Sequence, residues 1–114
     1  MGVAQMFTNR PSCTIWEQTV IDRSPAWVRH VTGAVYWQGC DAQRLAGTER
    51  RPEDRALCII HRDSIGSYTP KPDDRILPGT VGTDRPPADA LTVVTVKDFL
   101  FGSDAVQHIE VEAE

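Results

Sequence analysis

Cys58 and His61 have the spacing of half a zinc site, and no other stretch of the sequence comes closer to a metal-binding motif. Structural zinc sites usually contain two close ligand pairs because each pair sits on one tight turn, and here only one such pair is present. Further ligands would have to come from distant parts of the chain: Cys13, Cys40, His30 and His108. The pattern therefore favours cysteines and histidines that pack within the fold, and no metal or other cofactor is predicted.

Nucleophilic and acid-base chemistry find equally little support. Ser67 and Ser103 are the candidate nucleophiles, but neither stands in a G-x-S-x-G elbow. No glycine-rich phosphate loop of the G-x-x-x-x-G-K type occurs. The paired acids Asp73-Asp74 and Glu53-Asp54 lie in polar stretches, where we expect solvated surface side chains. The sequence predicts no catalytic residues and no enzyme.

Composition limits the protein to one soluble domain. The chain has 114 residues, 40% of them hydrophobic and 25% charged, with a formal net charge of -4. Its three cysteines are an odd number without paired spacing, which argues against a disulfide framework. No apolar run approaches the roughly 18 residues of a membrane span, and residues 1–9 lack the features of a signal peptide. We therefore expect a cytosolic protein, or one that assembles there, without affinity for membranes.

The elements that must position these side chains are predicted to be strands. Cys13–Ile21 is rich in β-branched and aromatic residues and is followed by the turn residues Asp22–Pro25. Ala26–Trp37 predicts one long strand that bends at Gly33. Ala56–Ile60 and Leu91–Val96 predict buried strands, Ile76–Leu77 leads into a Pro-Gly turn, and the alternation of His108–Glu114 is typical of a half-exposed final strand.

Loops separate these strands. The first, Gln38–Asp54, is polar and charged, with room for one helical turn at Asp41–Leu45. The second, Ser64–Asp74, contains Pro70 and Pro72, and we expect it to be exposed and mobile. The prediction is an all-β, mainly antiparallel fold, a small β-barrel or sandwich with long loops. Residues 1–114 form a single domain, with an extended N-terminal arm at 1–12 and a C-terminal strand or tail at 105–114.

Aromatic residues leave one binding function open. A barrel of this size can bind single-stranded nucleic acid by stacking bases on aromatic side chains, for which the candidates are Trp16, Trp27, Tyr36 and Trp37. That mode needs a cationic groove, whereas the basic residues here are scattered among acids. Packing in the core or in an interface is the favoured interpretation, and nucleic-acid binding is the alternative from a different class.

Short motifs follow one another along nearly the whole chain. In the first half, they are Met6-Phe7-Thr8-Asn9, Thr14-Ile15-Trp16, Thr19-Val20-Ile21 and Val35-Tyr36-Trp37. In the second half, they are Leu57–Ile60, the loop Ser64–Asp74, Ile76-Leu77-Pro78-Gly79-Thr80, Val96-Lys97-Asp98-Phe99, Gly102-Ser103 and His108-Ile109-Glu110-Val111. In their order, these motifs resemble a family of small "minor capsid" proteins from the head-to-tail connector region of tailed bacteriophages. Thr80 departs from the family pattern, which has aspartate there.

The resemblance implies a structural virion protein similar to head-closure, or stopper, proteins. Such proteins form a ring, taken here as hexameric, between the portal and adaptor above and the tail terminator below, and help to retain packaged DNA. By this resemblance, the chain is assembled in the host cytoplasm into the phage neck, where DNA passes the channel without specific binding. A tail terminator, or another head-tail joining protein, is the nearest alternative.

The resemblance also implies which segments make contacts. A loop that projects into the channel corresponds to Ser64–Arg75, with the candidate residues Ser64, Ile65, Gly66, Ser67, Tyr68 and Pro70. The two termini are the expected docking segments, and Gln38–Asp54 is a second candidate interface.

Overall fold

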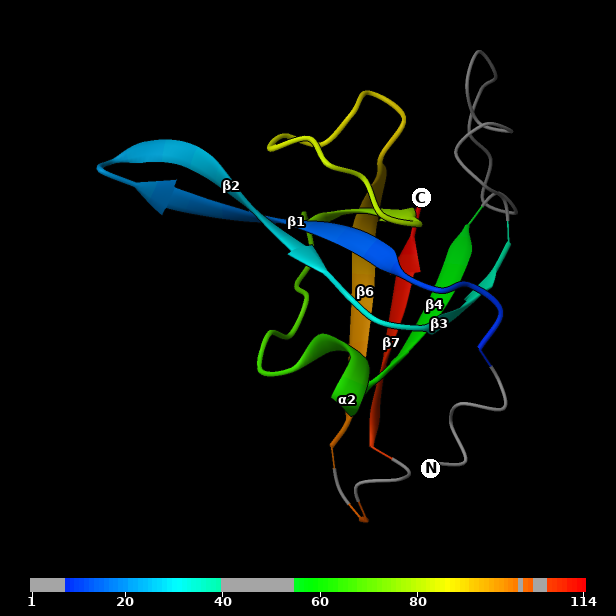
Figure 1. Cartoon of the computed structure of the whole chain (residues 1–114). Coiled ribbons are helices and arrows are strands. Elements are labelled where there is room, and N and C mark those ends of the chain that lie inside the picture. The colour runs from blue at the N-terminus through cyan, green and yellow to red at the C-terminus, as the bar shows by residue number, and fades with distance from the viewer. Residues whose placement is uncertain (1–7, 40–54, 101, 104–106) are drawn as a thin grey trace.

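Seven strands form one sheet in the computed structural model, which describes residues 8–39, 55–100, 102–103 and 107–114 (Figure 1). The order across the sheet is β2-β1-β5-β6-β7-β4-β3, and all pairings are antiparallel. The strands are β1 (Cys13–Ile21), β2 (Ser24–Val31), β3 (Val35–Gln38), β4 (Ala56–His61), β5 (Arg75–Pro78), β6 (Leu91–Phe99) and β7 (His108–Ala113), and a short helix, α2 (Arg62–Ile65), follows β4. The predicted all-β, mainly antiparallel fold is confirmed.

The sheet folds over on itself at β6. The first residues of β6, Leu91 and Thr92, pair with β5, whereas the segment from Val93 to Phe99 pairs with β7 and contains an irregularity in register after Val93. An irregularity of this kind bends a strand and increases its twist. As a result, β1 and β2 run across β6, β7 and β4 instead of lying beside them (Figure 1).

The main core lies between the two halves of this bent sheet. Its buried side chains come from every strand except β2: Cys13, Ile15, Val35, Trp37, Ala56, Cys58, Ile60, Ile76, Leu91, Val93, Ile109, Val111 and Ala113. Along β7, the alternate residues Ile109, Val111 and Ala113 are buried, as the sequence alternation predicts. A smaller cluster of Trp16, Leu77 and Ala90 lies on the other side of β1.

A single bridge spans the gap between β1 and β3, so the sheet is open rather than a fully closed barrel. Arg10, just before β1, pairs with Val35 of β3. The side chain of Asn9 continues this edge, since its Nδ2 donates to the Trp37 carbonyl over 2.8 Å and its Oδ1 accepts from the Trp37 amide over 2.7 Å. Because the edge of β3 is covered in this way, residues 9 and 10 belong to the sheet and not to a free N-terminal arm; residues 1–7 lie outside the described part.

The predicted long strand Ala26–Trp37 is wrong. The chain leaves β2 after Val31 and begins β3 at Val35, at the opposite end of the sheet. Gly33 lies between them, where its amide donates to the Ser64 carbonyl over 2.9 Å. The chain therefore crosses at Gly33 from one half of the sheet to the other. The pattern of period two runs through both strands only by chance.

At the C-terminus, the predicted half-exposed final strand is confirmed as β7 (His108–Ala113). Strand β7 lies between β6 and β4, near the middle of the sheet. Glu114 exchanges backbone hydrogen bonds of 2.8 and 2.9 Å with Thr92, and its carboxylate accepts from Arg55 Nε over 3.0 Å. The C-terminal residues are thus paired within the chain.

Candidate functional site: a projecting hairpin and its base

The hairpin of β1 and β2 extends well beyond the rest of the molecule (Figure 1). Its two strands pair from Thr14↔Val31 to Ile21↔Ser24, whereas β5 pairs with β1 only as far as Trp16. Beyond that point, two strands stand without a third. A lone two-stranded hairpin is at best marginally stable in water, so this part depends on support from elsewhere.

The turn at the tip has a backbone that suits Asp22 but not Arg23. Asp22 and Arg23 form the two-residue connection, with φ of 51° and 65°. Positive φ at both positions is the mark of a type I′ turn, whose twist matches the hairpin and which favours Asn-Gly or Asp-Gly. Arginine at the second position carries a steric cost that glycine would avoid.

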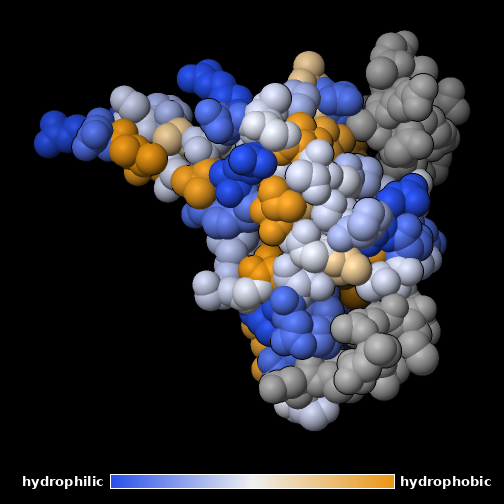
Figure 2. Space-filling model, viewed as in Figure 1, coloured by the Kyte–Doolittle hydropathy of each residue, from blue (hydrophilic) through white to orange (hydrophobic). Residues whose placement is uncertain are grey.

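Both faces of the hairpin expose apolar side chains. The exposed large hydrophobic residues of the described chain are Val20 at 67%, Ile21 at 54%, Val28 at 38% and Val31 at 45%, and all four lie on this hairpin. Neighbouring residues on a strand point to opposite faces, so Ile21 and Val28 lie on one face, while Val20 and Val31 lie on the other. Figure 2 shows apolar atoms along the projecting arm behind a hydrophilic tip. The four side chains are divided between two faces, but their concentration on one projecting arm makes this arm the candidate contact surface.

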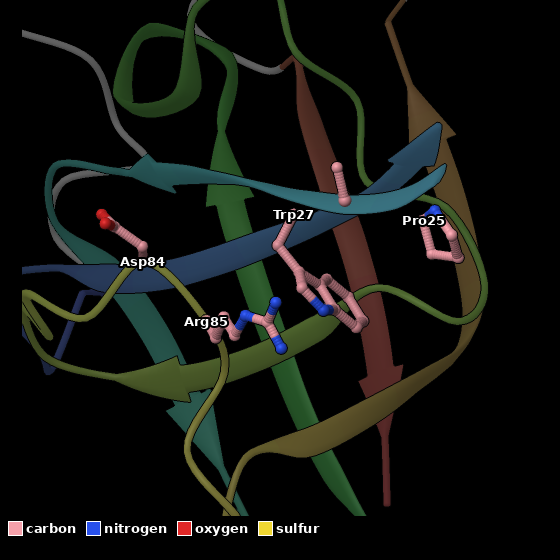
Figure 3. A pocket seen from close by; sticks show the side chains of 5 residues that line it. Pro25, Trp27, Asp84 and Arg85 are labelled. Atoms are coloured by element: carbon pink, nitrogen blue, oxygen red, sulfur yellow. The ribbon is translucent and has the colours of Figure 1, made fainter. Parts of the chain in front are cut away.

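A small pocket lies beside β2, on the face that carries Val20 (Figure 3). Its volume is about 290 Å³, and its lining residues are Pro25, Ala26, Trp27, Asp84 and Arg85. This volume is at the lower limit for small-ligand pockets, roughly 300–1,000 Å³. The pocket is therefore better suited to a few protruding side chains than to a cofactor.

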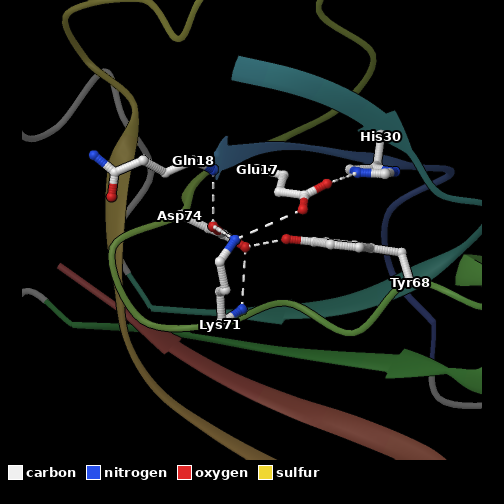
Figure 4. A network of polar contacts seen from close by, with 6 residues as sticks. All are labelled: Glu17, Gln18, His30, Tyr68, Lys71 and Asp74. Atoms are coloured by element: carbon white, nitrogen blue, oxygen red, sulfur yellow. Dashed lines mark hydrogen bonds and ion pairs between the residues drawn. The ribbon is translucent and has the colours of Figure 1, made fainter. Parts of the chain in front are cut away.

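A buried carboxylate, Asp74, fixes the base of the hairpin on its other face (Figure 4). Its Oδ1 accepts from the backbone amide of Gln18 over 3.1 Å and from Lys71 Nζ over 3.1 Å. Its Oδ2 accepts from the Lys71 amide over 3.0 Å and from the Tyr68 hydroxyl. These bonds join the segment after α2 to β1 at the point where β5 no longer pairs with it.

Tyr68 extends this network to β2. Its ring stacks on His30 with centroids 3.9 Å apart and planes 6° apart, and His30 Nε2 lies 2.9 Å from Glu17 Oε1. Burial and the hydrogen bond to Asp74 raise the pKa of the Tyr68 hydroxyl. Tyr68 therefore stays protonated and continues to donate to Asp74 at alkaline pH values where a free tyrosine, with a pKa of about 10, ionises.

The opposite face of the hairpin base is covered by the segment after β5. Trp16 Nε1 donates to the Thr83 carbonyl over 2.9 Å, and Arg29 donates to the Val81 carbonyl over 3.1 Å. The Thr14 hydroxyl donates to the Gly79 carbonyl over 2.8 Å. With the Asp74 network on one face and this segment on the other, the base is held firmly while the tip remains uncovered.

The predicted channel loop lies against the body of the protein instead of projecting from it. Ser64 and Ile65 belong to α2, and the Ser64 hydroxyl donates to the Ala34 carbonyl over 2.9 Å. Gly66 and Ser67 are exposed, Tyr68 is half-buried in the network, and Pro70 is buried. The expectation of an exposed loop is thus wrong for much of the segment, because Asp74 draws it inward; a role in a channel stays a prediction.

Of the candidate metal ligands in the part of the chain that the structure describes, Cys13 and Cys58 lie next to each other. Cys13 and Cys58 are buried core thiols, and the hydrogen bond with Cys13 together with burial raises the pKa of Cys58. His61 is buried as the N-cap of α2, where its Nδ1 accepts from the Asp63 amide over 3.3 Å. Within the described residues, no group of three or more potential ligands comes together. Cys40, the segment Asp41–Leu45 and most of the candidate interface Gln38–Asp54 lie outside the described residues.

Two of the aromatic residues considered as base-stacking platforms are in the core. Trp16 is 0% and Trp37 4% exposed, whereas Trp27 and Tyr36 are partly exposed. Of the paired acids, Asp73 is exposed but Asp74 is not, so the expectation that both are solvated is wrong for Asp74. Sequence reasoning therefore missed Asp74 and the exposed hairpin; the signal for the latter was the apolar pair Val20-Ile21 directly before a charged turn.

A family of unknown function, DUF6751, matches residues 7–114 of the chain. Neither the curated proteins nor the solved structures include a significant match. Among the residues that the structure describes, no helix has the length and apolar character needed to cross a bilayer. Since the family model covers nearly the full sequence, the chain belongs to the DUF6751 family.

Proposed function

We propose that this protein is a non-enzymatic structural subunit of a ring, the head-closure or stopper ring in the neck of a tailed bacteriophage. One observation carries the structural role: a two-stranded hairpin that exposes Val20, Ile21, Val28 and Val31 on its two faces. Free in water, this arm would leave apolar surface uncovered, whereas a neighbouring protein in an assembly would bury it. Rings require such a surface on every subunit.

The place in the phage neck rests on the resemblance of the sequence motifs to the "minor capsid" proteins of tailed phages. The net charge of -4 is compatible with a ring through which DNA slides, because an acidic subunit does not retain phosphates. In this proposal the portal or adaptor ring and the tail terminator are the neighbours, and the protein resides in the virion.

A head-closure role is preferred to a tail terminator on the basis of helix content. Terminators more often carry long helices packed on a sheet, whereas the helix in the described part of this chain, α2, has four residues. A circular dichroism spectrum dominated by helix would reverse the preference.

The test of the proposed function is made on particles. Mass spectrometry of purified virions from the source phage should detect the chain in multiple copies, and electron microscopy should place it as a ring in the neck. Absence of the chain from intact virions would overturn the proposal. Tight, salt-dependent binding of single-stranded DNA would point instead to the nucleic-acid alternative.

A further inference from the structure

We infer that the hairpin tip of one copy docks in the pocket beside β2 of a second copy of the same chain. The tip consists of Val20, Ile21, Asp22 and Arg23, and the pocket is the one lined in part by Asp84 and Arg85. The inference deepens the proposed function and rests on it, because it names the contact by which subunits of the ring would join.

The charges of the tip can pair with those at the rim of the pocket on a second copy. The tip presents one acid and one base, Asp22 and Arg23, and the rim of the pocket also presents one of each, Asp84 and Arg85. All four residues are exposed. Within the described residues, none of the four takes part in an ion pair. Two docked copies could therefore form two pairs, Arg23 with Asp84 and Asp22 with Arg85.

The tip and the pocket also both carry apolar surface. Val20 and Ile21, exposed at 67% and 54%, stand directly behind the charged turn. The pocket offers Pro25 and the indole of Trp27 as apolar walls (Figure 3). Apolar centres surrounded by a polar rim are the usual composition of protein interfaces.

The backbone of the tip supports a role for Arg23. A glycine there would relieve the positive φ of 65° at no steric cost, yet the position carries a long cationic side chain. Residues held in unfavourable backbone regions are concentrated at functional sites. An ion pair with a neighbouring copy accounts for an arginine at this position.

The proposed contact is directional. Tip and pocket adjoin on each copy, because Val20 pairs with Pro25, which lines the pocket. Reciprocal docking would bring two tips together in a closed pair, whereas a copy that uses its tip on one neighbour and its pocket on the other closes into a ring if the rotation allows. Edge-to-edge pairing of two β2 strands is a further competing arrangement. Pro25 disfavours it, because it lacks an amide donor on the edge strand.

Cysteine cross-linking separates these arrangements. In full-length chains with Cys40→Ser, one chain carries Ile21→Cys and the other Arg85→Cys; the remaining Cys13 and Cys58 are buried. Mild oxidation of the mixture should give a disulfide-linked dimer, whereas each chain alone should give none. Lys97→Cys, exposed on β6, replaces Arg85→Cys in the control mixture and should give no dimer.

A charge exchange provides the second arm of the experiment. Arg23→Glu should weaken self-association at least about tenfold, and Asp84→Arg in the same chain should restore most of it. Dimers of the Ile21→Cys chain alone, absence of the mixed dimer, or an unaffected Arg23→Glu variant would overturn the inference. If the wild-type chain assembles in those cases, the proposed function stands; if it neither assembles nor occurs in virions, the proposed function fails as well.

Discussion

At the scale of single residues, Asp74 determines how the hairpin is held. It is 0% exposed, and it accepts hydrogen bonds from four donors: the Gln18 amide, the Tyr68 hydroxyl, and the amide and Nζ of Lys71. Sequence reasoning placed Asp73-Asp74 at the surface because adjacent acids in a polar segment are usually solvated. Only the approach of β1, a long-range feature, provides the amide of Gln18 that favours burial of Asp74.

Replacing Asp74 by alanine should lower the free energy of unfolding by about 3 kcal/mol, since the buried donors lose a charged acceptor. Urea denaturation followed by circular dichroism measures this change. Asp73→Asn is the matched control: the neighbouring acid is exposed, and asparagine tolerates its φ of 78°, so the change should stay within about 0.5 kcal/mol. Equal effects of the two substitutions would contradict the role assigned to Asp74.

Tyr68 should make the folded state sensitive to alkaline pH. Its pKa is raised in the folded protein, whereas an unfolded tyrosine titrates near about 10. Above that pH the unfolded chain loses a proton that the folded chain keeps, so stability falls as pH rises, by at most about 1.4 kcal/mol per pH unit for one group.

The check compares wild type with Tyr68→Phe by urea denaturation at pH 8, 9, 10 and 11, conditions set by the range in which tyrosine titrates. Both chains contain Glu17, His30, Lys71 and Asp74, so the difference in slope isolates the Tyr68 hydroxyl. Wild type should lose stability more steeply than the variant above about pH 10. Parallel curves for the two proteins would show that the pKa of the Tyr68 hydroxyl is not raised in the folded protein.

At the scale of elements, local sequence patterns predicted most strands but not which strands pair with each other in the sheet. The runs Cys13–Ile21, Ala56–Ile60 and Leu91–Val96 correspond to β1, β4 and β6. The break at Gly33 was missed, because a period of two continues across it, and only the bond to Ser64 shows that the chain changes sides there. The sequence also did not predict how far the hairpin extends beyond β5, since this depends on the pairing between distant segments.

A substitution in the turn at the tip should stabilise the protein. Arg23→Gly should raise the free energy of unfolding by about 1 kcal/mol, because glycine adopts the positive φ of 65° without a Cβ clash. Ser24→Gly, one residue further on in extended β2, should instead lower it by roughly 0.5–1 kcal/mol. Thermal or urea unfolding of the two variants distinguishes the cases, and a destabilised Arg23→Gly protein would contradict the type I′ assignment.

At the scale of the whole molecule, an all-β body holds one arm away from itself. The body is stabilised by a core shared between the two halves of the sheet, and the bonds on both faces of the hairpin base fix the direction of the arm. The apolar residues of the arm contribute little to the folding stability of the isolated chain, because they remain exposed. Their contribution is expected in an assembly, which is why substitutions there should alter association and leave folding intact.

Sedimentation velocity of the full-length chain over a wide concentration range tests this account most directly. We expect wild type to form one closed oligomer of fixed stoichiometry. The variant Val20→Glu/Ile21→Glu should sediment as a monomer with an unchanged circular dichroism spectrum, since both side chains are exposed. A wild-type chain that remains monomeric at the highest concentrations, or a variant that assembles as wild type does, would contradict the central claim that this protein acts through its projecting hairpin in a ring.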